Sequence, residues 1–149
     1  MSSRLAIVTA VVALTAGTLW YLTAPPKGED GYRERAASSA ETLRSQVELA
    51  RIWVEAAEDE ESTKTAALVG LQETERDATS TASSFEYEPP AGLNPLRSEL
   101  SSLARETRNA LGSLRIAAQQ EEWARFGELA SPLSDLAARL EDFEERVEP

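Results

Sequence analysis

The 149-residue sequence predicts an all-α protein: a single N-terminal transmembrane helix, followed by an antiparallel three- to four-helix bundle with coiled-coil-like heptad packing. Three observations lead to this prediction. An uncharged apolar stretch opens the chain, apolar residues then recur at alternating steps of four and three, and no strand-like alternation competes. The predicted domains are a signal anchor over 1–24, a proline- and glycine-rich spacer over 25–31, and an acidic helical domain over 32–149.

The stretch from Leu5 to Leu22 contains no charged side chain. Extended to Ala24 it is about 20 residues long, which spans roughly the 30 Å of a bilayer's hydrocarbon core. Trp20 and Tyr21 would then lie at the membrane interface. A cleaved signal peptide and a buried core helix are the alternatives. The stretch is long for a signal peptide, its cleavage site is poor, and core helices of this length rarely lack polar residues. We therefore expect an uncleaved anchor in the cell membrane.

The sequence gives conflicting signals on which side of the membrane the C-terminal domain lies. Only Arg4 precedes the stretch, whereas Lys27, Arg33 and Arg35 follow it, and this count favours a cytosolic domain. The later bases are interleaved with acids, however, and the short N-terminal tail is similar to the start of an export signal. We expect a single-pass protein with an extracytoplasmic C-terminal domain, and a cytosolic domain remains the alternative.

The composition excludes several classes of function. The chain has a net charge of −11 and contains neither cysteine nor histidine. Disulfides, thiol nucleophiles, the commonest metal ligand and the commonest general base are therefore absent. Because no pair of carboxylates has a recognisable spacing either, we expect no enzymatic activity, no cofactor and no metal site. Nucleic acid and anionic lipid are not expected partners, since the basic residues are scattered singly among acids.

Four helices are expected, over about 32–60, 63–86, 95–119 and 121–147. In the first, apolar residues recur at steps of four and three from Ala36 to Ala57, and four more widen the stripe: Leu49, Ile52, Trp53 and Ala56. The second stripe is weaker but keeps the same phase. A single long helix over 32–85, about 80 Å in length, is therefore the alternative to a hairpin. Four consecutive acids followed by a serine and a threonine favour a turn at 60–63.

Prolines and a phase change mark the later boundaries. Asn94 is the expected N-cap of the third helix, with Pro95 in its first turn. The fourth stripe is out of phase with the third, which predicts a turn or stutter at 119–122. Pro132 lies inside the fourth stripe, so we expect a kink there or a restart capped by Ser131.

Two aromatic residues are the best candidates for a binding site. Trp123 and Phe126 are three residues apart beside a predicted turn, and with Glu122 they form the candidate partner contact. Aromatic residues at helical spacing are more often part of a core than of a binding site, so core packing is the stronger alternative. Thr107 and Glu75 are candidate polar groups in a ligand groove, or polar core positions that fix the register of the helices.

These features together predict a non-enzymatic interaction or scaffold module in a bacterial cell envelope. The 13 arginines against two lysines are typical of a high-GC bacterium. The anchor would attach the module to the membrane, and a helix face would bind a protein partner or a second copy of the chain. The layout is also similar to that of the inner-membrane subunit of phage spanins, which implies a role in envelope assembly or lysis. A helical small-molecule sensor is the other alternative.

Overall fold

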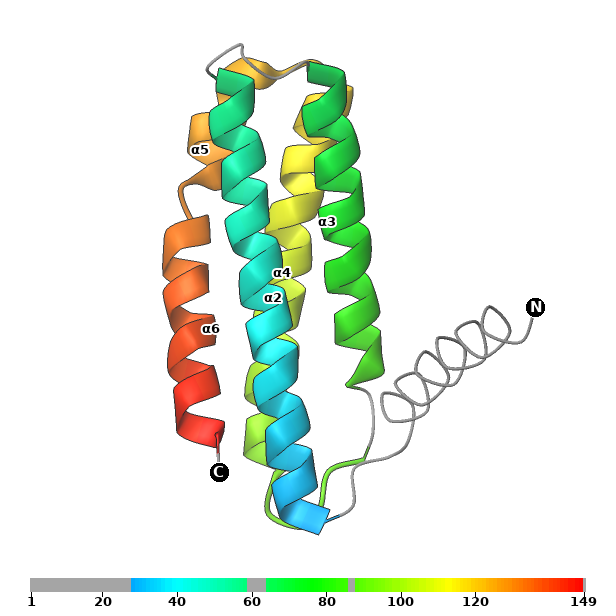
Figure 1. The fold of residues 1–149 in the computed structure, drawn as a ribbon, viewed down its shortest axis with the longest axis vertical. Helices are drawn as coiled ribbons and strands as arrows, with labels where there is room; N and C mark the ends of the chain where they lie inside the picture. Colours follow the sequence, from blue (N-terminus) through cyan, green and yellow to red (C-terminus); the bar gives the residue numbers. More distant parts are fainter. Residues whose placement is uncertain (1–27, 59–63, 86–87, 149) are drawn as a thin grey trace, which may run out of the picture.

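The computed structural model describes residues 28–58, 64–85 and 88–148, and within them the chain forms an all-α bundle of antiparallel helices (Figure 1). The first three helices of the bundle are α2 (Gly28–Glu58), α3 (Lys64–Ser84) and α4 (Asn94–Gln119). In place of a fourth continuous helix, three shorter helices follow one another: η1 (Trp123–Arg125), α5 (Phe126–Ala130) and α6 (Leu133–Val147). The predicted all-α bundle is therefore confirmed. No helix among the described residues is long and apolar enough to span a membrane. The predicted anchor over 1–24, with Trp20 and Tyr21, lies outside these residues.

The α2–α3 pair is a hairpin rather than one long helix. α3 returns alongside α2, and the predicted turn at 60–63 lies outside the described residues. The two helices pack closely where Trp53 lies against Gly70, because a Cβ atom at Gly70 would overlap the indole ring. A residue without a side chain at this position lets α3 approach the tryptophan on α2.

α2 begins at Gly28 instead of Tyr32, so residues 28–31 are helical and do not belong to the predicted spacer. Gly28 has a φ of +80°, which glycine adopts without steric cost. Glu29 and Asp30 then occupy the first turn, where negative charge complements the positive end of the helix dipole. Arg33 donates a hydrogen bond to Glu29 at 2.9 Å and supports the same turn. The acidic residues therefore start the helix earlier than the apolar stripe indicates.

The start of α4 is fixed by burial rather than by a cap. Asn94 is the first helical residue, so its predicted role as N-cap is wrong, whereas Pro95 does lie in the first turn. Leu93 occupies the cap position without a side-chain hydrogen bond and is itself buried. Its carbonyl accepts a hydrogen bond from the Arg97 amide at 3.1 Å.

The expected single helix over 121–147 is divided into three pieces. The predicted break at Pro132 is confirmed, since α5 ends before this residue and α6 begins after it. Pro132 has no N–H to donate, but its carbonyl accepts the amide of Leu136 at 3.0 Å. Ser131 does not cap α6, because its hydroxyl donates to the carbonyl of Glu128 at 2.8 Å.

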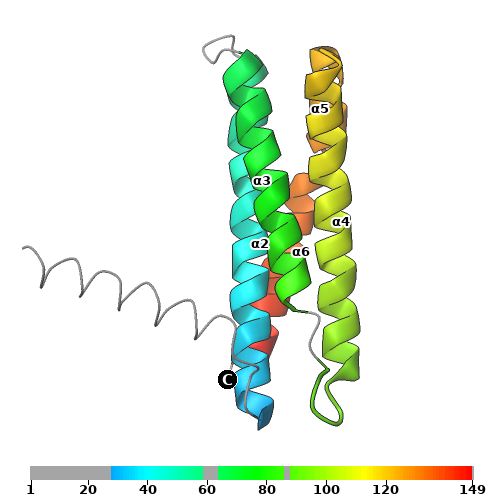
Figure 2. The ribbon, with the colours of Figure 1, turned by 90° about the vertical axis from the view of Figure 1, so that its right-hand side faces the viewer.

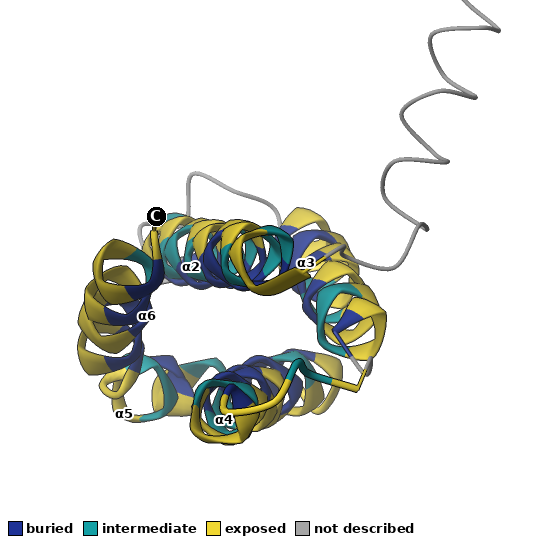
Figure 3. Cartoon of the chain, turned by 90° about the horizontal axis from the view of Figure 1, so that it is seen from below, coloured by how far each residue is buried: buried dark blue, intermediate teal, exposed yellow. Residues whose placement is uncertain are grey.

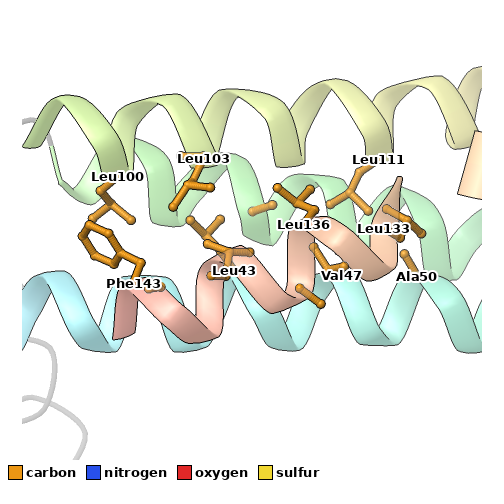
Figure 4. Close-up of a cluster of buried hydrophobic side chains, with 14 of the residues drawn as sticks. Leu43, Val47, Ala50, Leu100, Leu103, Leu111, Leu133, Leu136 and Phe143 are labelled. Atoms are coloured by element: carbon orange, nitrogen blue, oxygen red, sulfur yellow. The ribbon is translucent and has the colours of Figure 1, made fainter. Parts of the chain in front are cut away.

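One apolar core runs along the axis of the bundle, and the buried faces of the helices point toward it (Figure 3). Side chains from α2, α4 and α6 interdigitate, among them Leu43, Val47, Leu103, Leu136 and Phe143 (Figure 4). α3 contributes smaller residues, which explains its weaker stripe: Ala67, Gly70, Leu71, Thr74 and Ala78.

Two buried threonines are satisfied inside their own helices. Thr74 donates to the carbonyl of Gly70 at 2.7 Å, and Thr107 donates to the carbonyl of Leu103 at 2.9 Å. Their hydroxyls therefore need no partner in the core.

Candidate interaction surface

The two ends of the bundle differ in what they expose. We call the end that holds the end of α2, the start of α3, the end of α4 and η1 the distal end (Figure 1). The proximal end holds Gly28 and the connection from α3 to α4. Among the described residues, four large apolar side chains are exposed, and all belong to the distal half: Leu49 (40%), Ile52 (58%), Val69 (47%) and Ile116 (45%). Leu49, Ile52 and Val69 lie on the neighbouring helices α2 and α3, and we call these three residues the distal surface. Ile116 lies on α4, across the bundle from α2 (Figure 3).

The distal surface centres on the contact between α2 and α3. Ile52 and Val69 are the sequence neighbours of Trp53 and Gly70, which pack against each other. The prediction that four further residues widen the buried stripe of α2 is wrong for Leu49 and Ile52, which are exposed, whereas Trp53 and Ala56 are half-buried. Neither Leu49 nor Ile52 belongs to the four-three series from Ala36 to Ala57, whose members are all buried. That difference in register was the signal in the sequence.

The predicted aromatic pair packs against the core at the distal end. The rings of Trp123 and Phe126 are tilted against each other, with centroids 4.9 Å apart. Phe126 is fully buried, whereas Trp123 is only half-buried. The Lys64 ammonium lies 5.5 Å from the Trp123 ring centroid, a cation–π contact that ties η1 to the start of α3. Phe126 is therefore a core residue in this fold, and the partner-contact role of Trp123 stays a prediction.

The turn before η1 has an unusual backbone. Glu121 has a φ of 58°, a left-handed conformation that is uncommon outside glycine. The Glu121 amide donates to Ala118 at 3.2 Å and the Glu122 amide donates to Ala117 at 2.8 Å. These bonds satisfy the last carbonyls of α4 in the manner of a Schellman motif, with glutamate where glycine is usual. The strained residue thus directly precedes the candidate contact residues.

Glu122 already has a partner. Its carboxylate lies 2.5 Å from Nη1 of Arg125, and this hydrogen bond raises the pKa of Arg125. A cation on a partner protein would compete with Arg125 for Glu122.

Two buried donors at this end lack an acceptor. Nε1 of Trp53 and Nε1 of Trp123 have no hydrogen-bond partner within the part of the chain that the structure describes. Buried donors are satisfied in most native structures, so unpaired ones call for an explanation such as a functional site.

The two polar candidates do not meet in a groove. Glu75 forms an ion pair with Arg115 at the edge between α3 and α4. Thr107 is fully buried on the core side of α4. Neither side chain belongs to the distal surface.

Comparison of the chain with protein-family models, with curated proteins and with solved structures finds no match. Its function is therefore argued from its own surfaces.

Proposed function

We propose that the protein is a membrane-anchored, non-enzymatic helical module of the bacterial cell envelope, which binds a protein partner through its distal surface. The observation that carries this proposal is the position of the exposed apolar side chains. All four lie in the distal half, whereas large apolar side chains at the proximal end, such as Phe85 and Leu93, are buried. Apolar side chains exposed in one region of a protein are typical of protein–protein interaction sites.

The predicted anchor supports the choice of this end. The apolar stretch over 5–22 precedes Gly28, which lies at the proximal end of the bundle. α2 has 31 residues, and at 1.5 Å per residue it would extend about 45 Å from its start. An anchor before Gly28 would therefore place the distal surface on the side of the module that faces away from the membrane, where a partner can reach it.

Neither alternative is favoured by an observation of its own. A spanin-like role is expected to use a long continuous helix, whereas α2 and α3 fold back on each other. A sensor needs a ligand cavity, and pockets for small molecules typically hold about 300–1,000 Å³. The apolar hollow beside Leu43, Phe85 and Leu100 has room for only about 10 Å³. The groove between α4 and α6 holds about 340 Å³, but it is open and its arginines are already paired with the glutamates of α4.

Site-specific photocross-linking of the full chain in its native membrane tests the proposal. A photoreactive residue replaces Ile52 or Val69, and Ser38 serves as the matched control. Ser38 is exposed on α2, and at 3.6 residues per turn it lies on nearly the same face as Ile52 but toward the proximal end. We expect adducts from Ile52 and Val69 and none from Ser38. An adduct with a second copy of the chain would identify a homo-oligomer as the partner. Equal adducts from all three positions, or none from any, would contradict the proposal.

A further inference from the structure

We infer that the groove between the end of α3 and the first half of α4 binds a phosphate group. The groove has a volume of about 150 Å³ and lies toward the proximal end, where α3 and α4 run side by side (Figure 2). Three arginines and two serines supply its polar lining: Arg97, Arg105, Arg108, Ser83 and Ser101. No carboxylate among the residues that the structure describes lines it, although the chain as a whole is strongly acidic.

α4 separates its charges between its two sides. Its two carboxylates form ion pairs with α6, Glu99 with Arg146 and Glu106 with Arg139, each at 2.6 Å. These pairs lie beside a second groove, on the α6 side of α4. The glutamates of α4 are thus directed away from the groove that faces α3.

The guanidinium groups of this groove are not neutralised by ion pairs with any described residue. Arg97, Arg105 and Arg108 form no ion pair within the described ranges of the chain. Arg105 differs from the other two, because it donates a weak hydrogen bond at 3.3 Å to the hydroxyl of Ser102, which lines the second groove, and its charge helps to lower the pKa of Glu106. These three arginines are separated along the sequence but form a local cluster in the fold.

Helical geometry places this cluster on one face. Residues 97, 101, 105 and 108 follow at steps of four, four and three, so their side chains share one side of α4. The positive charge of Arg97 also acts on Tyr32: burial raises the pKa of this tyrosine, and Arg97 opposes that rise. The Tyr32 hydroxyl is buried and lacks a hydrogen-bond partner in the described structure.

The size and charge of the groove indicate the class of ligand. A volume of about 150 Å³ is below the roughly 300–1,000 Å³ of pockets for larger organic molecules, so a compact group fits best. Three guanidinium groups favour a group with more than one negative charge. The planar fork of arginine matches phosphate oxygens in bidentate hydrogen bonds, and the hydroxyl of Ser101 adds a donor, whereas that of Ser83 already donates to the carbonyl of Thr79.

The phosphate could come from solution or from a lipid headgroup. Binding of free phosphate requires nothing beyond the groove itself. Binding of a headgroup rests on the proposed function, because the groove meets a membrane only if the anchor over 1–24 holds the proximal end close to it.

Nitrogen-15 NMR of the arginine Nε–Hε groups, with the full chain in zwitterionic micelles, tests the inference. The probes are inorganic phosphate and a short-chain phosphatidylglycerol. Sodium chloride of equal ionic strength and a short-chain phosphatidylcholine are the controls. We expect saturable shifts at Arg97, Arg105 and Arg108. Three arginines that already pair with a glutamate of their own or the preceding turn should not shift: Arg33, Arg51 and Arg125.

A pair of triple variants with the same change in net charge completes the test. Arg97→Gln/Arg105→Gln/Arg108→Gln should weaken binding at least about tenfold, because each charged hydrogen bond contributes substantially. Arg33→Gln/Arg51→Gln/Arg125→Gln should change it less than about twofold, since these side chains lie outside the groove. Both variants should keep the circular dichroism spectrum of the wild type.

Each outcome decides the inference. Saturable shifts with both probes, with phosphate alone or with phosphatidylglycerol alone support the site and assign its source. Shifts at all arginines alike, equal weakening by the two triple variants, or no saturable shift with either probe would overturn it. Cross-linking at Ile52 is a separate readout, so failure of the phosphate site is distinguishable from failure of the proposed function.

Discussion

At the proximal end of the bundle, Tyr32 and Phe85 pack ring against ring with centroids 5.1 Å apart, and both side chains are buried. At the distal end, Ile52 and Val69 face solvent, although Phe126 is fully buried there. The single apolar core of the bundle thus extends to the distal end without Ile52 and Val69. Folding does not require Ile52 and Val69 to be apolar, which leaves these side chains available to a partner.

The two sides of α4 differ in a similar way. On the α6 side, Arg139 and Arg146 are each neutralised by a glutamate of α4. On the α3 side, Arg97 and Arg108 face a groove that no carboxylate of the described segments lines. One helix therefore carries arginines that hold the bundle together and arginines that do not. We expect the first kind to affect stability and the second kind to affect ligand binding.

The largest effect should come from the proximal aromatic contact. Phe85→Ala removes a buried ring and should lower the free energy of unfolding by about 3–5 kcal/mol. Ile52→Ala at the distal surface should change it by only about 0.5 kcal/mol, because Ile52 is 58% exposed. Urea unfolding monitored by circular dichroism measures both. Similar losses in the two variants would contradict the difference between the ends.

A smaller effect is expected at the contact of α2 with α3. Gly70→Ala places a methyl group where the Trp53 ring lies, so the ring must move, and we expect a loss of about 1–3 kcal/mol. Gly112→Ala is the matched control, because its Cβ would lie 3.1 Å from a terminal oxygen of Glu75. Thermal unfolding should show the greater loss for Gly70→Ala, together with a shift in tryptophan fluorescence. The opposite order would mean that Trp53 does not hold α3 in place.

Much of the fold is predictable from the sequence because the spacing of apolar residues along a helix determines which face is buried in the core. The four-three series of α2 is buried throughout, and Pro132 ends α5 as its missing N–H requires. The cap of α4 could not be predicted, since Leu93 is fixed by tertiary burial and not by a local hydrogen bond. The earlier start of α2 had a sequence signal in Glu29 and Asp30, which the apolar pattern does not contain.

The candidate surfaces were only partly accessible to sequence analysis. The spacing of Trp123 and Phe126 correctly places them together, but spacing cannot say that Phe126 points into the core. The arginine groove depends on which neighbour of α4 receives its glutamates. That choice follows from the packing of α3 and α6 around α4, which no single stretch of sequence specifies.

The ion pairs between α4 and α6 should contribute less than the apolar contacts. Glu106 and Arg139 are both about two-fifths exposed, and exposed pairs typically contribute about 0.2–1 kcal/mol. A double-mutant cycle with Glu106→Gln and Arg139→Gln should give a coupling energy in that range. Arg108→Gln, on the other side of α4, should leave stability nearly unchanged. A larger loss from Arg108→Gln than from Arg139→Gln would reverse the assignment of the two sides.

The smallest effect is a dependence on pH. The hydrogen bond from Arg139 holds the pKa of Glu106 below its usual range. A carboxylate with a lowered pKa stabilises the fold above the pKa of the unfolded chain, and this stability is lost as the pH falls through the lower, folded value. Glu106→Gln should therefore slightly reduce the loss of stability between about pH 7 and pH 3. In a chain that already carries Arg139→Gln the same substitution should have no such effect, and equal effects in the two backgrounds, measured by urea unfolding, would contradict the role of Arg139.

The most direct test of partner binding at the distal surface combines a cross-link with a substitution. A photoreactive residue at Val69 of the full chain, in its native membrane, is compared in wild type, Ile52→Asp and Ser38→Asp. Both substitutions add one negative charge to an exposed position of α2 and should leave the melting temperature unchanged. We predict that the Val69 adduct disappears in Ile52→Asp and persists in Ser38→Asp. An adduct that persists in both variants, or that disappears in both, would contradict partner binding through the distal surface.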